Sequence, residues 1–113
     1  MVNLFEQGDI IYLDFNPQTG HEQKGKRPAI IVTNNLFNKY SKMLMVCPIT
    51  NTNNHFPLHI PLDERTKTSG VILCEHIKAL DLNNRKYQVI EKLPNDIMTK
   101  IINIVYSEIE IIK

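Results

Sequence analysis

The chain has 113 residues, of which 42% are hydrophobic and 22% are charged, and its formal net charge is +1. This length fits a single domain, residues 1–113, and the composition excludes a disordered chain and a protein that coats nucleic acid with positive charge. No apolar run approaches the roughly 18 residues of a membrane-spanning helix, and no leader pattern is visible, so we expect neither a membrane segment nor secretion.

Short β-like segments occupy most of the chain. The first, 9–15, is rich in branched and aromatic residues and ends in turn-forming ones. The next, 29–33, follows Pro28, which suits the first residue of a strand. The remaining β-like segments are 43–50, 57–62, 70–80 (one bent strand or two) and 87–93. No helix-length segment separates them, so the sheet is expected to be mostly antiparallel. Pro48 indicates an edge strand or a strand end.

The C-terminal segment predicts one helix. Pro94 precedes Asn95, which is expected to be the N-cap, and Asp96 favours the first turn. The apolar residues that then recur at helical spacing, and predict a single apolar face, are Ile97, Met98, Ile101, Ile102, Val105 and Ile109. The fold class is therefore mainly β with a C-terminal helix, a small barrel with the helix across it.

The two cysteines, Cys47 and Cys74, each lie inside an apolar run. Buried free thiols are favoured over a disulfide at such positions, which indicates a reducing compartment, the cytoplasm. An apolar setting also raises the pKa of a thiol and makes it a poor nucleophile.

The histidines do not form a convincing metal site. His55 and His59 are four residues apart, but Pro57 excludes a helix between them, and on a strand they would lie about 13 Å apart. We therefore expect no metal site. Phosphate-binding loops, dinucleotide fingerprints and nucleophile elbows are not found either.

A cluster of polar groups occupies "GHEQKGKRPAI", residues 20–30, at the start of an apolar strand. Arg27 directly precedes a proline, so its backbone is held extended, and its planar guanidinium matches two phosphate oxygens at once. Thr50 closes another apolar run, where its hydroxyl could donate to a phosphate. A solvated charge and an ordinary turn former are the alternative interpretations of these two residues.

Four stretches carry a family resemblance: "GDIIYLDFNPQTGHEQKGKRPAIIVT" (8–33), "VCPIT" (46–50), "FPLHIPL" (56–62) and "GVILCEHIKALD" (70–81). In order and spacing they resemble the MazF/PemK family of toxin endoribonucleases. The resemblance implies an SH3-like (CcdB/MazF-type) antiparallel β-barrel, a homodimer and a cytosolic, metal-independent and cofactor-free ribonuclease. It also implies a cognate acidic antitoxin whose tail lies in the RNA groove.

Carried over by position, the resemblance implies that Arg27 and Thr50 are the catalytic arginine and threonine. Glu22 and Gln23 match the family's Glu-Gln pair in the first long loop. The expected reaction is attack by the RNA 2′-hydroxyl on the adjacent phosphorus, giving a 2′,3′-cyclic phosphate and a 5′-hydroxyl. Arg27 and Thr50 would stabilise the charge on the phosphate oxygens, and Glu22 would transfer a proton or orient Arg27.

Further residues are expected to bind the single-stranded RNA substrate, an mRNA. Lysines would hold its backbone without reading bases, and the polar loop after Thr50 would read or stack on unpaired bases, unless it is an ordinary turn. The lysines are Lys24, Lys26, Lys39 and Lys42, and the loop residues are Asn51, Asn53, Asn54 and Phe56.

Two other functions remain open at this point. Gyrase poisons such as CcdB have a similar barrel, but they act through aromatic and small residues at the C-terminus, and this chain ends in "EIEIIK". A catalytically inactive barrel that binds RNA or protein is the third possibility.

Overall fold

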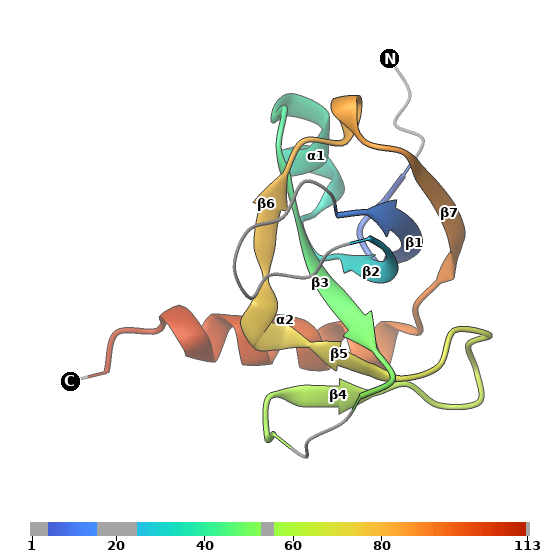
Figure 1. Ribbon diagram of the computed structural model, residues 1–113. Coiled ribbons are helices and arrows are strands. Elements are labelled where there is room, and N and C mark those ends of the chain that lie inside the picture. The colour runs from blue at the N-terminus through green and yellow to red at the C-terminus, as the bar shows by residue number, and fades with distance from the viewer. Residues whose placement is uncertain (1–4, 16–24, 53–55, 113) are drawn as a thin grey trace.

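The computed structural model describes residues 5–15, 25–52 and 56–112. Seven strands and two α-helices form within this part of the chain (Figure 1). The strands are β1 (Asp9–Asp14), β2 (Lys26–Ile31), β3 (Leu44–Thr50), β4 (His59–Pro61), β5 (Val71–Leu73), β6 (Lys78–Leu80) and β7 (Tyr87–Lys92). The helices are α1 (Asn35–Tyr40) and α2 (Asn95–Ile109), and two single 3₁₀ turns are η1 (Cys74–His76) and η2 (Leu82–Asn84).

The strands pair in the order β4-β5-β3-β2-β1-β7, and β6 also pairs with β3. Every pair is antiparallel, as the short connections predict. Among the described residues, β6 and β7 do not pair with each other, so the sheet curls into a barrel shape without hydrogen-bonded closure (Figure 1). The predicted fold class is confirmed. The segment 70–80 forms two strands, β5 and β6, joined by η1.

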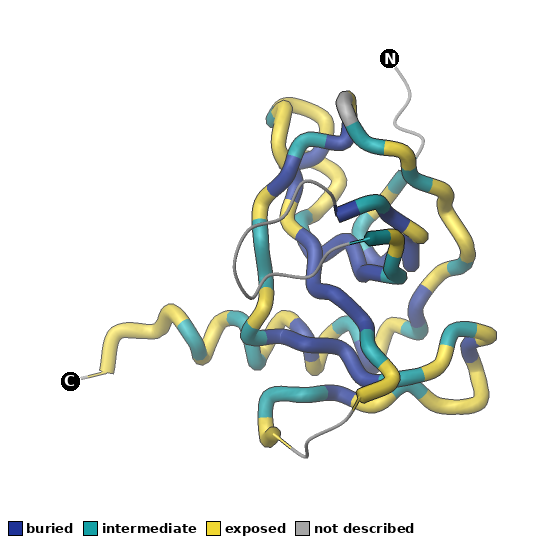
Figure 2. Tube along the Cα trace, viewed as in Figure 1, coloured by how far each residue is buried: buried dark blue, intermediate teal, exposed yellow. Residues whose placement is uncertain are grey.

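Hydrophobic side chains from the two faces of the sheet form separate clusters. The first lies between the sheet and α2 and includes Ile10, Ile30 and Ile101, all fully buried. The second lies on the other face and includes Leu13, Ala29 and Val46. Figure 2 shows this buried centre along β1, β2 and β3. Burying apolar residues on both faces of the central strands fixes their register, since a slip of one residue would exchange the two sets.

Pro48 does not mark an edge strand or a strand end. It lies within β3, is fully buried and pairs with Ala29 of β2. On its other side, β3 pairs with β6 through residues 44–46 and with β5 through residues 49–50. Pro48 therefore lies where β3 changes partner, and its missing N–H removes no ladder hydrogen bond there.

Two boundaries and one short helix differ from the predictions. β2 begins at Lys26, so Pro28 is its third residue and pairs with Tyr12. Helix α2 begins at Asn95, so its N-cap is Pro94 and not Asn95, and no side chain caps this helix. The short helix α1 was not predicted, although its N-cap is clear: the Asn34 side chain accepts a hydrogen bond of 2.8 Å from the Phe37 N–H.

The predicted apolar face of α2 is only partly buried. Ile97 and Ile101 lie in the core, and Met98 and Val105 pack against it. Ile102 is 38% exposed and Ile109 is 76% exposed. The C-terminal end of the helix extends past the sheet (Figures 1 and 2). No helix of the described part is long and apolar enough to span a membrane.

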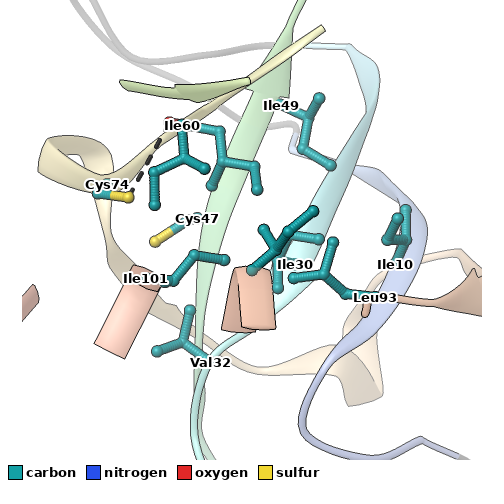
Figure 3. Close-up of a cluster of buried hydrophobic side chains, with 11 residues drawn as sticks. Ile10, Ile30, Val32, Cys47, Ile49, Ile60, Cys74, Leu93 and Ile101 are labelled. Carbon is teal, nitrogen blue, oxygen red and sulfur yellow. Dashed lines mark hydrogen bonds between the residues drawn. The ribbon is translucent and has the colours of Figure 1, made fainter. Parts of the chain in front are cut away.

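Both cysteines are buried free thiols, as expected, and they lie in the first cluster (Figure 3). A hydrogen bond with the Cys74 thiol and burial both raise the pKa of the Cys47 thiol well above its ordinary value. The Cys47 thiol is therefore poorly suited to act as a nucleophile, and burial keeps the Cys74 thiol from a substrate.

Candidate active site

A pocket of about 310 Å³ opens beside the ends of β2 and β3. It is lined by Arg27, Thr50, Thr52, His59, Leu73, Glu75 and His76. Six of these seven side chains are polar, and they come from four separate elements and the loop after β3. The pocket therefore brings together one guanidinium, two hydroxyls, two imidazoles and one carboxylate.

Strand register explains why Arg27 and Thr50 meet although they are far apart in sequence. In the β2–β3 ladder, Ala29 pairs with Pro48. Continued by two residues, this register places Arg27 opposite Thr50, on the side of the sheet that Ala29 and Pro48 face. The two predicted catalytic residues thus converge on one pocket.

The same argument places His59. In the β4–β5 ladder His59 pairs with Leu73, and in the β3–β5 ladder Ile49 pairs with Ile72. Leu73 and His59 therefore share a side of the sheet with Pro48, and so with Thr50. The turn η1 directly after β5 then brings Glu75 and His76 to the same pocket.

The Thr50 hydroxyl is oriented by its own loop. Its Oγ1 accepts a hydrogen bond of 3.2 Å from the Thr52 N–H. Because a hydroxyl has one hydrogen and two acceptor sites, this contact leaves the hydrogen to be donated into the pocket. An oxyanion is the ligand such a donor suits, and the half-buried Arg27 on the facing strand suits the same ligand.

His59 and Glu75 form an ion pair or charge-assisted hydrogen bond at the pocket wall. The His59 Nε2 lies 2.7 Å from the Glu75 Oε2, and the two side chains are 5% and 26% exposed. The His76 Nε2 lies 3.7 Å from the same oxygen. Behind them, burial and the charge of Glu75 raise the pKa of Glu108 on α2. Glu75 is therefore the carboxylate around which this side of the pocket is organised.

Other predicted site residues lie outside this pocket. Asn51 is exposed, and its Oδ1 accepts a hydrogen bond of 3.1 Å from the Ser69 hydroxyl. Phe56 packs edge-on against the His59 ring, with centroids 5.4 Å apart. Glu22, Gln23, Lys24 and Asn53 lie outside the described residues, so their roles stay predictions.

Of the predicted RNA-binding lysines, the three that the structure describes do not line the pocket. Lys26 lines a second hollow of about 140 Å³ with Tyr12, Lys86, Tyr87 and Gln88. Lys26 and Arg27 are adjacent on a strand, so their side chains leave opposite faces of the sheet. Lys39 lies on α1, at the end of the barrel opposite β4 (Figure 1), and Lys42 follows that helix.

Sequence reasoning missed His59, Glu75 and His76 as site residues. Nothing in the sequence next to His59, Glu75 or His76 points to this pocket. They reach it only because β4 pairs with β5 and β5 pairs with β3, the strand that ends at Thr50. Among residues 5–15, 25–52 and 56–112, no three His, Cys, Asp or Glu side chains gather as a metal ion would require.

Fold and pocket define a class of protein: small antiparallel barrels with a C-terminal helix and an arginine–threonine pocket at the strand ends. The chain belongs to the PemK-like, MazF-like toxins of type II toxin–antitoxin systems, an endoribonuclease family whose model matches residues 6–107.

Individual relatives agree with this assignment. Endoribonuclease PemK of Escherichia coli is 32% identical over 101 residues, which cover 86% of this chain and 76% of the relative. The crystal structure of MazF (Form-I) from Deinococcus radiodurans superposes with a TM-score of 0.86 at 28% identity, covering 95% of this chain and 97% of that one. The MazE–MazF (Form-II) crystal structure from the same organism gives a TM-score of 0.82 at 28% identity, covering 95% and 96%.

Proposed function

We propose that this protein is the toxin of a type II toxin–antitoxin system and that it cleaves single-stranded mRNA at specific sequences without a metal ion. In this proposal the 2′-hydroxyl of the RNA attacks the adjacent phosphorus and leaves a 2′,3′-cyclic phosphate and a 5′-hydroxyl. The observation that supports it most directly is the pocket that Arg27 and Thr50 share.

The pocket suits the charge that develops in this reaction. Negative charge gathers on the non-bridging phosphate oxygens as the new P–O bond forms, and preorganised donors that face these oxygens lower the barrier. Arg27 offers two parallel N–H donors, and the hydrogen of the Thr50 hydroxyl offers a third. The nucleophile belongs to the RNA itself, so the protein needs no serine or cysteine attacker, in keeping with its two buried thiols.

The test is to incubate the purified protein with a pool of defined transcripts in the presence of EDTA. We expect cleavage at a restricted set of sites, with new 5′ ends that a polynucleotide kinase can label directly because they carry a hydroxyl. Loss of cleavage on adding EDTA would contradict the metal-independent reaction. Inhibition of DNA supercoiling without RNA cleavage would indicate a gyrase poison, and neither activity would indicate an inactive binding barrel.

We also propose an acidic antitoxin as the partner of this toxin in the cytoplasm. Between residues 25 and 62 the sequence has four Lys or Arg residues and no Asp or Glu, so this segment carries a net positive charge that attracts a polyanion. Positive charge of this kind attracts both RNA and an acidic polypeptide. The MazE–MazF complex is a structural neighbour of this chain, which supports a partner of that kind.

A homodimer is the proposed assembly. Apolar side chains at the end of α2 and after it are strongly exposed, with Tyr106 at 61%, Ile109 at 76% and Ile112 at 84%. Neighbouring apolar residues exposed to this extent indicate an interface. Sedimentation equilibrium at micromolar concentration is expected to give twice the 13.1 kDa of one chain. A monomer mass would contradict the dimer.

A further inference from the structure

The proposed reaction needs a group that removes the proton of the attacking 2′-hydroxyl, and neither Arg27 nor Thr50 suits that task. An arginine side chain stays protonated at any working pH, and a threonine hydroxyl is a weak base. Within the described part of the pocket, the side chains with a lone pair that can accept a proton are the imidazoles of His59 and His76 and the carboxylate of Glu75.

His59 is the better placed of the two imidazoles. Its side chain is 5% exposed, against 43% for His76, and its Nε2 lies 2.7 Å from Glu75 Oε2, against 3.7 Å for His76 Nε2. A carboxylate only accepts hydrogen bonds, so this contact puts the hydrogen of a neutral His59 ring on Nε2. The lone pair then lies on Nδ1.

The Nδ1 atom of His59 is buried and has no hydrogen-bond partner among the described residues. Leaving a buried ring nitrogen unpaired costs free energy, and His59 lines the pocket, so a ligand that enters the pocket can supply the missing partner. A hydroxyl group is a suitable donor to this lone pair.

Resting on the function proposed above, we propose that His59 is the general base of RNA cleavage and that Glu75 is the positioning residue that holds its ring. The O2′–H proton moves to His59 Nδ1 as the O2′ electron pair forms the bond to phosphorus. The P–O5′ bond breaks, its electron pair stays on O5′, and O5′ takes a proton from water. The imidazolium afterwards returns its proton to solvent, so the reaction has no net proton change.

Two features of the surroundings fit this role. The negative charge of Glu75 stabilises the imidazolium that forms, as a carboxylate does beside a catalytic histidine. Nδ1 is covered in the unliganded structure, so RNA must displace a neighbour, and Phe56 is the suitable one: it packs edge-on against the ring and is itself 43% exposed.

Several charged groups determine how the activity depends on pH. Glu75 and His76 on η1 and Arg27 on β2 line the pocket with His59. Glu108 on α2 interacts with Glu75, and burial together with that interaction raises the pKa of Glu108. The variants below must therefore be compared over a full pH series and not at one pH.

The decisive variant is His59→Gln. A glutamine amide N–H can donate to Glu75 in place of Nε2, but the amide cannot accept a proton, so a purely structural role would survive the change. Single-turnover cleavage of an RNA that the wild type cuts is expected to slow by about 10²–10³-fold, the usual range for a general base. The dependence of the rate on the protonation state of the base, seen as a rise with pH in the wild type, is expected to disappear. Binding of the same RNA with a 2′-deoxy nucleotide at the cut site should change by less than about threefold.

Further variants keep the test decisive if His59→Gln folds poorly. His59→Ala is expected to regain activity when free imidazole is added, and Glu75→Gln is expected to slow cleavage by about 10–10²-fold with the same retained binding. Glu64→Gln is the matched control, because Glu64 is exposed and does not line the pocket, and it should cut like the wild type.

Each outcome separates the inference from the proposed function. If the wild type cuts no RNA, the function is wrong. If the wild type cuts RNA but His59→Gln cuts within about threefold of it, or loses binding in parallel with the rate, His59 is not the base. If Glu22→Gln and not His59→Gln removes the pH dependence, the base is Glu22.

Discussion

Replacing Arg27 with alanine is expected to lower the rate of RNA cleavage by at least about 10³-fold, because in the proposed mechanism the change removes the paired donors that stabilise the scissile phosphate. Arg27 lies at the start of β2 and is only half-buried, so the sheet should persist, with a wild-type circular dichroism spectrum. The measurement is single-turnover cleavage of a mapped RNA, made alongside that spectrum. Cleavage by the folded variant at the wild-type rate would contradict the assignment of the site.

Two further variants test whether the loss of cleavage comes from the guanidinium group in the pocket or from the change in net charge. Arg27→Lys keeps the positive charge but loses the planar fork, so it is expected to restore only part of the activity. Lys100→Ala removes an exposed cation from α2, far along the chain from the pocket residues, and is expected to leave cleavage unchanged. Equal losses in Arg27→Ala and Lys100→Ala would mean that net charge matters and not the pocket.

Replacing Gly70 with alanine is expected to damage the fold and the site together. Gly70 has a φ of +121°, and a Cβ added there would clash with the Thr50 carbonyl oxygen. The backbone at Thr50 and at Gly70 cannot shift without breaking other contacts. Thr50 pairs with Val71, and the Gly70 carbonyl accepts a hydrogen bond from the Leu62 N–H. We expect a loss of about 2–4 kcal/mol in the free energy of unfolding, within the range of strained-backbone and overpacking changes.

The activity of folded Gly70→Ala protein should also fall, because relief of the clash displaces the backbone that carries the Thr50 hydroxyl. Gly8→Ala is the matched control: its φ is +89°, but the nearest atom to an added Cβ is Lys92 Cδ at an ordinary 3.5 Å. It should lose stability through backbone strain alone, about 1 kcal/mol, and cut RNA normally when folded. If Gly70→Ala and Gly8→Ala lost the same stability in urea unfolding and the same cleavage activity, the predicted clash at Gly70 would be contradicted.

The strands and the terminal helix follow largely from local patterns. Branched and aromatic runs predict five of the strands near their observed bounds, and the spacing of Ile97 and Ile101 predicts α2 and the face that it buries. Local patterns fail where the position of a residue in the sheet depends on which strands pair with its own strand. Pro48 looks like an edge residue, yet it lies in the most connected strand, because β3 changes partner there.

The residues of the pocket could be predicted only in part, because strand pairing also decides which of them meet. The neighbours of Arg27 and Thr50 in the sequence indicated groups that can bind phosphate. The family resemblance then favoured a catalytic role over a solvated charge or a turn former. His59 and Glu75 could not be identified in this way, because they are linked by a contact of 2.7 Å between residues 16 positions apart in the sequence. Residues 16–24, which include Glu22, lie outside the described part, so the sequence remains the only guide to them.

The sequence by itself determined the class of this protein: one domain, mainly antiparallel strands with a C-terminal helix, and the arginine and threonine of a toxin family. These features depend on residue type and on short-range periodicity, which a linear chain displays. Only the tertiary structure decided which groups share the pocket, because strand register sets Arg27 opposite Thr50 and carries His59 and Glu75 to the same place. Register depends on long-range burial of two hydrophobic faces, and no local segment contains that information.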